Sequence, residues 1–496
     1  MQYFRFVFAI CALVAGVRGG AQPDTVRLSL DQLIRIAQSD APDVQIARTA
    51  LNNNYWRYQS FLANYKPQID LTATLPDFNR AIDAIVQPDG TELFKERTLM
   101  RNNVGIALRQ DVALTGGTVF ARTDIARLDV FATSGSDRSI SYLTTPISIG
   151  FLQPLFAFNA LKWDKRVQPL VYDEAQRIYS EDMEQVAFDA ARLFFEVLIA
   201  QYNLDAARRD QADADTLYRI SEGRYGVGRI AETELLQFQL NARNAEAELA
   251  QRTLDLQTST EQLRDFLGIQ EPIFFQMEIP DDLPIIAINP DTALTYAQRY
   301  RSESVNFERR LLEARRDVAQ AKGETGLNVD IFASFGLQQT APTVGEAYTS
   351  PLDNERITIG LDLPIADWGK DRSRREIAQS NLELTQMRVQ QDRINFEREV
   401  LVKVQQFDLI RLQVDIAAQS YEVAQKKREL NRNRYLVGKV GVTELNIAIS
   451  EEINARRNYI NALRNYWLAY FELRRLTLYD FENNRPLIRT AAVGRS

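Results

Sequence analysis

Two short stretches of the chain are nearly the same, RYGVGRIAETEL at residues 224–235 and RYLVGKVGVTEL at residues 434–445. Both keep Arg-Tyr, Val, Gly and Thr-Glu-Leu in the same order, 210 residues apart. Glycine readily adopts the left-handed backbone geometry found where a helix ends and the chain reverses. Each stretch therefore predicts the turn of a hairpin of two antiparallel helices, and the chain contains two such hairpins.

The similarity between the two halves extends beyond these turns. Ile149-Gly150-Phe151 recurs 210 residues later as Ile359-Gly360-Leu361, whereas Ile69-Asp70-Leu71 recurs 260 residues later as Val329-Asp330-Ile331. The change of spacing places an insertion of about 50 residues within 77–146. We interpret the chain as a tandem duplication. Its predicted parts are a first repeat at 22–267, a linker at 268–290, a second repeat at 291–480 and a C-terminal tail at 481–496.

Each repeat is expected to hold three helices. The apolar residues of the longest helix in each repeat follow a three-four spacing, which is typical of a coiled-coil seam. In the first repeat they are Met183, Val186, Ala190, Leu193, Val197, Ala200, Leu204 and Ala207. In the second they are Phe407, Ile410, Val414, Ala417, Tyr421 and Ala424. The predicted helices span 31–64, 164–222 and 231–267, and then 291–322, 370–436 and 441–480.

Four segments alternate apolar and polar residues with the period of two that is typical of a strand with one apolar face. They begin near Ile69, Ile147, Val329 and Ile357. Pro154 and Pro364 are expected to end the second and fourth strands. The insertion alternates in the same way on both sides of Thr115-Gly116-Gly117, which predicts an extra hairpin. Whether this hairpin joins the sheet is open, so each chain supplies four or six strands.

The composition excludes several kinds of chemistry. The chain has 496 residues, no histidine and one cysteine, so no Ser-His-Asp triad, Cys-His pair or His-containing metal site can form. The adjacent carboxylates of Glu451-Glu452 would face apart on a helix, so we interpret them as surface charge. The formal net charge of −7 disfavours binding to nucleic acid. We expect no enzyme activity, no cofactor and no metal.

Residues 1–21 have the features of a secretory signal peptide. Arg5 is followed by an apolar run from Val7 to Val17 and by small residues at 19–21. In an exported bacterial protein, strands with an apolar face suit the outer membrane, where a β-barrel must close because lipid cannot bond free backbone groups. Four strands cannot close a barrel alone, whereas three copies would supply twelve. The alternative at this point is a soluble, rod-shaped scaffold with a protected sheet edge.

The order of these motifs resembles the TolC-type outer-membrane efflux proteins. The resemblance rests on the duplication, the two hairpin turns, and the strand-to-helix turns Gln153-Pro154-Leu155-Phe156 and Leu363-Pro364-Ile365-Ala366-Asp367-Trp368-Gly369. It implies a mainly α-helical fold with a transmembrane β-barrel, in which the coiled-coil hairpins of a homotrimer form an α-barrel tunnel. It also implies a passive exit channel for efflux or type I secretion, in the outer membrane with the tunnel in the periplasm. Its partners would be an inner-membrane pump, a periplasmic adaptor (membrane fusion) protein and outer-membrane lipid.

The resemblance also implies roles for residues around the two turns. Those implied to dock the adaptor are Arg224, Tyr225, Gly226, Gly228, Arg434, Tyr435 and Gly438. Those implied to surround the periplasmic aperture are Thr233, Glu234, Thr443 and Glu444. Three copies of one carboxylate around a narrow axis would attract cations. The chain departs from some family members in having Val440 in place of a gate-locking arginine and Ile447 in place of a second aspartate.

A periplasmic coiled-coil structural or adaptor protein is the alternative function. Adaptors typically add a lipoyl-like domain and a β-barrel domain to a single hairpin, and neither is recognisable in this sequence. Two hairpins with four strands favour the exit channel.

Overall fold

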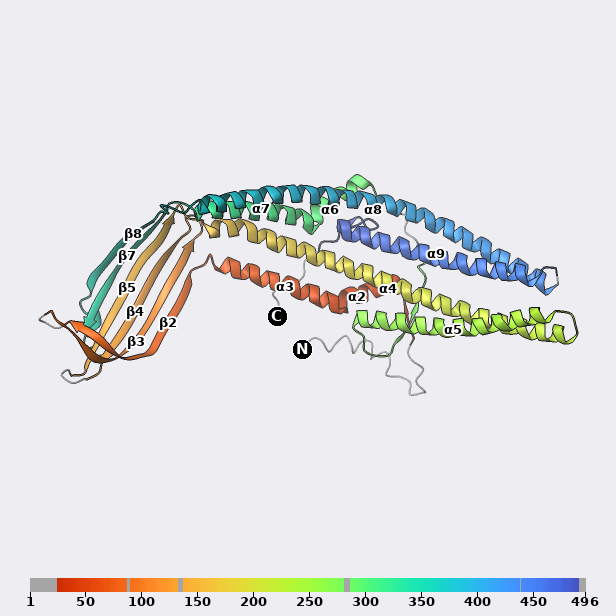
Figure 1. The fold of residues 1–496 in the computed structure, drawn as a ribbon, viewed down its shortest axis with the longest axis horizontal. Helices are drawn as coiled ribbons and strands as arrows, with labels where there is room; N and C mark the ends of the chain where they lie inside the picture. The colour runs from red at the N-terminus through yellow and green to blue at the C-terminus, as the bar shows by residue number, and fades with distance from the viewer. Residues whose placement is uncertain (1–24, 87–89, 133–136, 281–285, 438, 490–496) are drawn as a thin grey trace. The chain divides into compact units, whose positions relative to one another are not determined.

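The computed structural model describes residues 25–86, 90–132, 137–280, 286–437 and 439–489 (Figure 1). The predicted signal peptide and Gly438 lie outside the described residues. The chain divides into two compact units, and each draws on both halves of the sequence. The first, which we call the hairpin unit, comprises residues 1–50, 177–301 and 397–491. The second, the sheet unit, comprises residues 51–176 and 302–396.

Helices of equal length recur in the two halves of the chain. Each half has helices of 11, 22, 67 and 36 residues in that order. The first half contains α2 (Leu30–Asp40), α3 (Pro42–Ala63), α4 (Ala160–Gly226) and α5 (Glu232–Leu267). The second half contains α6 (Pro290–Tyr300), α7 (Ser302–Gly323), α8 (Lys370–Leu436) and α9 (Val442–Thr477). Such matching lengths are what a tandem duplication produces.

The first predicted helix of each half is divided in two. Ala41 ends α2 in an extended conformation because the residue before a proline disfavours helical geometry, and Pro42 then starts α3. In the second half Arg301 is extended between α6 and α7, and its guanidinium donates a hydrogen bond of 3.0 Å to the carbonyl oxygen of Arg475. A break of one residue hardly changes the spacing of apolar side chains, so the sequence pattern did not reveal it.

The predicted seam of α4 is buried. All eight of its residues, from Met183 to Ala207, have exposed fractions of 7% or less. A second buried row on the same helix consists of Ala187, Ala191, Phe194, Phe195 and Leu198. On α8 the seam residues Phe407, Val414 and Ala424 are buried and the other three are half-buried. The seam is therefore confirmed. α4 also contains Pro169, which the prediction from apolar spacing did not consider.

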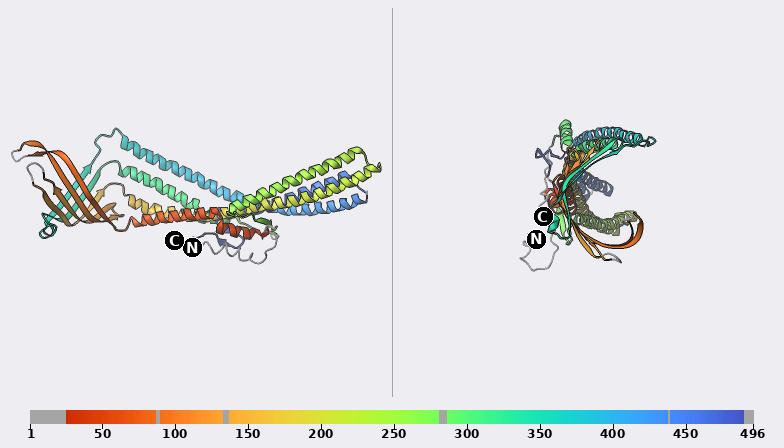
Figure 2. Two further views of the ribbon diagram at one scale, coloured as in Figure 1. Left: turned by 90° about the horizontal axis from the view of Figure 1, so that it is seen from below. Right: turned by 90° about the vertical axis from the view of Figure 1, so that its left-hand side faces the viewer.

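Six antiparallel strands form one sheet in the sheet unit, shown side by side in Figures 1 and 2. Their order is β2 (Gln68–Val86), β3 (Glu92–Val112), β4 (Gly117–Val130), β5 (Ser139–Leu155), β7 (Asn328–Ala341) and β8 (Leu352–Asp362). The insertion supplies β3 and β4. The open choice between four and six strands is thereby settled at six.

The prediction that Pro154 ends the pairing of its strand is wrong. Pro154 lies within β5 and is opposite Asp330 of β7. The pairing of β5 with β4 stops earlier, at Leu152 opposite Thr118, so the missing N–H of Pro154 need not break that ladder. By contrast, β8 ends at Asp362, before Pro364, as expected.

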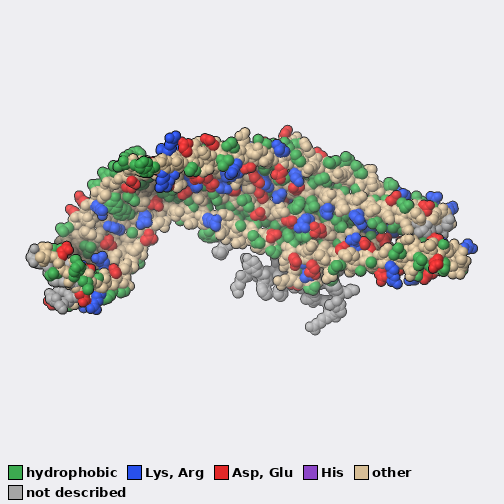
Figure 3. Space-filling view, viewed as in Figure 1, with side chains coloured by type: hydrophobic (Ala, Val, Ile, Leu, Met, Phe, Trp, Pro, Cys, Tyr) green, Lys and Arg blue, Asp and Glu red, His purple; other side chains and the backbone are tan. Residues whose placement is uncertain are grey.

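One face of the sheet is apolar. Ile69, Leu108, Ala121, Ile149 and Phe335 are successive partners across five strands, and Ile357 of β8 lies on the same face. On the two outermost strands, Ile69 and Ile357 are 73% and 77% exposed. Hydrophobic side chains gather over the strands in the space-filling view (Figure 3). This face therefore has no cover within the single chain as described.

The opposite face is largely polar, and the sheet is curved (Figure 2). One row across all six strands consists of Gln68, Arg109, Phe120, Gly150, Ser334 and Arg356. At Gly150 an added Cβ would come within 2.5 Å of the Ala333 carbonyl oxygen and 2.6 Å of the Phe120 ring. Only glycine permits this close approach of neighbouring strands on the polar face.

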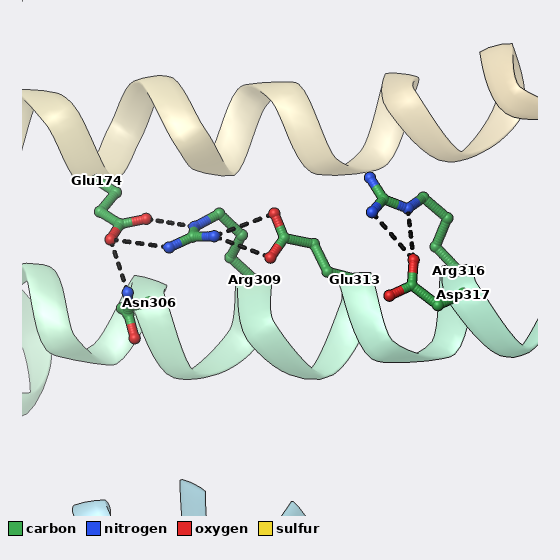
Figure 4. A network of polar contacts seen from close by, with 6 residues as sticks. All are labelled: Glu174, Asn306, Arg309, Glu313, Arg316 and Asp317. Atoms are coloured by element: carbon green, nitrogen blue, oxygen red, sulfur yellow. Dashed lines mark hydrogen bonds and ion pairs between the residues drawn. The ribbon is translucent and has the colours of Figure 1, made fainter. Parts of the chain in front are cut away.

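A polar network joins α4 to α7 within the sheet unit (Figure 4). Arg309 of α7 forms ion pairs with Glu174 of α4 and, at 2.9 Å, with Glu313 one turn along its own helix. Asn306 donates a hydrogen bond of 2.8 Å to the same Glu174 carboxylate. Because Glu174 belongs to the first half and Arg309 to the second, this network links the two halves of the chain.

A buried carboxylate holds several segments of the hairpin unit together. Glu184 of α4 is fully buried and forms ion pairs with Arg474 of α9 at 3.0 Å and with Arg489 at 3.5 Å. Arg489 also donates to the side-chain oxygen of Gln38 on α2. Two small sheets complete the unit, β1 (Thr25–Leu28) with β6 (Phe274–Met277) and β9 (Tyr479–Asp480) with β10 (Arg485–Pro486). Within the described ranges no helix is long and apolar enough to cross a membrane.

Candidate gate and docking site at the hairpin ends

The first hairpin turn has the geometry that its glycine predicts. Gly228 follows the end of α4 with a φ of +70°, which a residue with a side chain rarely adopts. Its N–H donates a hydrogen bond of 2.8 Å to the Tyr225 carbonyl oxygen, and the Arg229 N–H donates one of 2.8 Å to that of Arg224. These two bonds satisfy the last carbonyl groups of α4. Gly226 is the last residue of the helix, and the Tyr225 side chain is 43% exposed.

The second turn follows the same plan. The Lys439 N–H donates a hydrogen bond of 2.9 Å to the Arg434 carbonyl oxygen, which corresponds to the Arg229 to Arg224 bond in the first turn. Tyr435 lies in the last turn of α8, and Val437 just beyond the helix is 68% exposed. The six described residues of the predicted docking set thus lie at the ends of the two long helices.

Three of the four predicted aperture residues line one groove. This groove, of about 730 Å³, lies between the first turns of α5 and α9 in the hairpin unit. Its lining residues are Thr233, Glu234, Gln237 and Phe238 of α5 with Thr443, Asn446, Ile447, Ser450, Glu451 and Asn454 of α9. Eight of its ten lining residues are polar, and each hairpin contributes one carboxylate, Glu234 and Glu451.

Glu444, the fourth predicted aperture residue, does not line this groove. It lies in the first turn of α9 and is exposed. A carboxylate is favourable there because the first turn of a helix carries unpaired N–H groups and the positive end of the helix dipole. The structure therefore brings Glu234 and Thr443 together in the groove and leaves Glu444 outside it.

The sequence analysis missed an arginine that connects the two hairpins. Arg428 of α8 donates hydrogen bonds to Glu452 of α9 at 2.8 Å and to Asp213 of α4 at 3.3 Å. Asp210 lies 3.9 Å from the same guanidinium. No pattern within one helix marks a pair of residues that lie 215 positions apart in the chain.

The interpretation of Glu451-Glu452 as surface charge is wrong for Glu452. The Glu452 side chain is buried, and burial without a partner would be costly, so its ion pair with Arg428 compensates the charge. Burial also raises the pKa of the nearby Asp210 carboxyl, and Asp213 and Glu452 raise it further against the opposing effect of Arg428. Glu451 is exposed and pairs with Lys427 at 2.5 Å.

The sequence matches the family described as outer membrane efflux protein over residues 33–269 and 304–477. No curated protein matches the sequence. Among solved structures, the chain is similar to the CmeC outer membrane channel of Campylobacter jejuni, with 16% identity and a TM-score of 0.65 over 93% of this chain and 87% of that one. It is also similar to the outer membrane protein VceC of Vibrio cholerae, with 14% identity and a TM-score of 0.60 over 90% of this chain and 95% of that one.

A third similar structure is the open state of the MtrE outer membrane channel of Neisseria gonorrhoeae, with 14% identity and a TM-score of 0.59 over 90% of this chain and 88% of that one. At such identities the structures show a shared fold, and the family match carries the function. The resemblance to TolC-type proteins is thus confirmed, and the alternative of a periplasmic structural or adaptor protein is not favoured. The chain therefore belongs to the outer membrane efflux protein family and is an outer-membrane exit channel whose helical tunnel lies in the periplasm.

Proposed function

We propose that three copies of this chain form a passive duct, without catalysis, that receives substrates from an inner-membrane pump through a periplasmic adaptor. The observation that carries the proposal is a second apolar stripe on α8. It consists of Val402, Leu409, Ile416, Val423 and Leu430, which recur every seven residues, and each is at least 41% exposed. A heptad repeat of apolar residues is the pattern with which one helix packs against another.

The stripe lies on a different side of α8 from the buried seam. Leu409 follows the seam residue Phe407 by two positions, which is a rotation of about 200° around an α-helix. A helix with apolar stripes on both sides has a neighbour on each side in the wall of a helical tunnel. One stripe is buried within the chain, so we assign the other to a neighbouring copy.

The aperture is proposed at the turns, where Thr233, Glu234, Thr443 and Glu444 begin α5 and α9. In a trimer the groove between these helices would occur three times around the axis and would present repeated carboxylates to the passing solute. Such rings of carboxylates favour cations. The proposal is supported by the groove, which brings together residues from both hairpins.

Docking of the adaptor is proposed at the exposed turns. The residues are Arg224, Tyr225, Gly226 and Gly228 of the first turn and Arg434, Tyr435 and Gly438 of the second. Gly228 shapes the first turn, while arginine and tyrosine side chains are common in the centres of protein interfaces. Exposed Val227 and Val437 add apolar area to these tips.

The predicted organisation of the chain agrees with this function and remains part of the proposal. Residues 1–21 would direct export, and the repeats at 22–267 and 291–480 would each contribute one hairpin to the tunnel. The linker at 268–290 contains β6 and the tail at 481–496 contains β10, and both of these strands lie in the hairpin unit.

Mass measurement of the purified complex and recording in planar bilayers test the proposal. We expect a trimer that conducts ions with a preference for cations, and Glu234→Ala or Glu444→Ala should lower that preference. Glu246→Ala, which removes an exposed carboxylate farther along α5, is the matched control and should leave the preference unchanged. A monomer that forms no conducting pore would contradict the duct, whereas unchanged selectivity in both variants would contradict only the aperture.

A further inference from the structure

The six-stranded sheet has two outer edges with no partner among the described residues. β2 forms one edge and β8 the other. Successive strands are antiparallel and their number is even, so β8 of one copy can pair with β2 of the next and continue the same alternation. Unpaired edges are not tolerated in lipid, whereas repetition around a ring leaves no edge.

The two strands from the insertion are central to this sheet. β4 pairs with β3 from Gly117 to Val130 and with β5 from Thr118 to Val130. Both edges of β4 are therefore bonded along nearly its whole length. If the inserted hairpin were folded away over the mouth of a barrel, the pairing of β3 with β2 and of β4 with β5 would be lost.

The inserted strands also carry the apolar face. Ile106 of β3 lies opposite Leu71 of β2, and Val119 of β4 lies opposite Phe151 of β5. All four side chains are exposed in the single chain. On the other face Arg109 and Arg122 alternate with these apolar residues. A hairpin that lay in water would have no need of an apolar face continuous with that of its neighbours.

We infer that three copies of this chain close an eighteen-stranded barrel in which β3 and β4 face lipid on one side and the bore on the other. The inference rests on the proposed trimer and replaces the twelve strands that four strands from each of three copies would supply. With strands about 4.8 Å apart and tilted by about 40°, the backbone diameter is about 36 Å, against about 24 Å for twelve strands. The exit in the membrane is then about 1.5 times wider than in a barrel without the insertion.

Imaging of the purified full-length complex by electron cryomicroscopy counts the strands directly. We expect a trimer with eighteen strands. A trimer with twelve strands and the hairpin outside the wall would overturn this inference and leave the proposed function intact. A complex that is not a trimer would overturn both. A second variant, in which residues 77–137 are replaced by a short turn, should give a trimer whose barrel is narrower by about one third.

Cysteine labelling in intact membranes tests the orientation of the inserted strands. Ile106→Cys is predicted to face lipid and to react several-fold less with a charged, water-soluble maleimide than Ala107→Cys on the other face of the same strand. Reagents that partition into lipid should react with both. Equal labelling of the two positions by the charged reagent would place β3 in water and overturn the inference, even if the complex were a conducting trimer.

Discussion

The two longest helices have the same length but different surroundings in the chain. α4 and α8 both have 67 residues. In the hairpin unit, α4 buries two rows of apolar side chains, whereas α8 buries one row and exposes the other, with Leu409 56% and Ile416 55% exposed. The scaffold of the two halves is thus alike, and the side chains distinguish a helix covered by its own chain from one whose second apolar face is exposed, which we assign to a neighbouring copy.

Placing charges in the exposed stripe of α8 is the strongest test of this difference between α4 and α8. Leu409→Glu combined with Ile416→Glu should reduce the trimer at least about tenfold, because carboxylates would have to enter an apolar contact between copies. Native mass measurement in detergent gives the fraction of trimer.

Gln413→Glu is the matched control for this variant. Gln413 is exposed on α8 but lies outside the stripe, so the added charge should leave the trimer intact. If the double variant also remained fully trimeric, the stripe would not be the contact between copies. The exposure of α8 would then not mark it as the helix that packs against a neighbouring copy.

Truncation of Phe195 tests the buried second row of apolar side chains on α4. This side chain is fully buried, so Phe195→Ala should lower the free energy of unfolding by about 3–5 kcal/mol through lost burial and the cavity left behind. Urea denaturation followed by circular dichroism measures the change. Phe195→Leu, which keeps most of the apolar volume, should cost much less, and equal losses for the two variants would argue against a close-packed site.

Much of the fold could be predicted because repeated patterns carry it. The seam from Met183 to Ala207 and the alternation in the strands are local signals, and the structure buries or pairs the residues accordingly. The breaks at Ala41 and Arg301 were missed because a single extended residue barely disturbs the helical period. Pro154 was misjudged because the effect of a proline depends on where the neighbouring strand ends, which the sequence does not show.

The candidate site was only partly predictable for a related reason. The turns around Gly228 have a strong local signal, since a positive φ favours glycine. The contacts of Arg428 depend instead on which faces of α4, α8 and α9 meet, and Glu452 therefore looked like an ordinary surface acid. Tertiary contacts decide the partners of a charge, whereas sequence spacing decides only its side of the helix.

Arg428 tests how α8 and α4 depend on each other, because it joins the two helices directly. Arg428→Ala should destabilise the contact between the two hairpins by about 1–3 kcal/mol, since it leaves the buried Glu452 carboxylate without this partner. We expect the conductance in planar bilayers to rise several-fold as the ends separate. Lys427→Ala removes the neighbouring exposed pair with Glu451 and should change stability by less than about 1 kcal/mol. An equal rise in conductance for both variants would show that general loss of positive charge, and not the inter-hairpin contact, opens the ends.

The smallest expected effect concerns protonation of Asp210 on α4. Because burial raises its pKa in the folded chain, the folded state holds this proton more tightly than the unfolded state does. Its stabilising contribution is therefore fully present below the ordinary aspartate pKa of about 3.9 and is lost as the pH rises through the raised value. Asp210→Asn removes this loss of stability at higher pH, so the variant should melt at a slightly higher temperature than the wild type at pH 7 and at nearly the same temperature at pH 3.5.

The exposed Asp205, one and a half turns earlier on α4, provides the control, since Asp205→Asn should produce no such difference between the two pH values. A higher melting temperature for Asp210→Asn at both pH values would mean that altered packing, and not the buried charge, limits the stability of α4 beside α8.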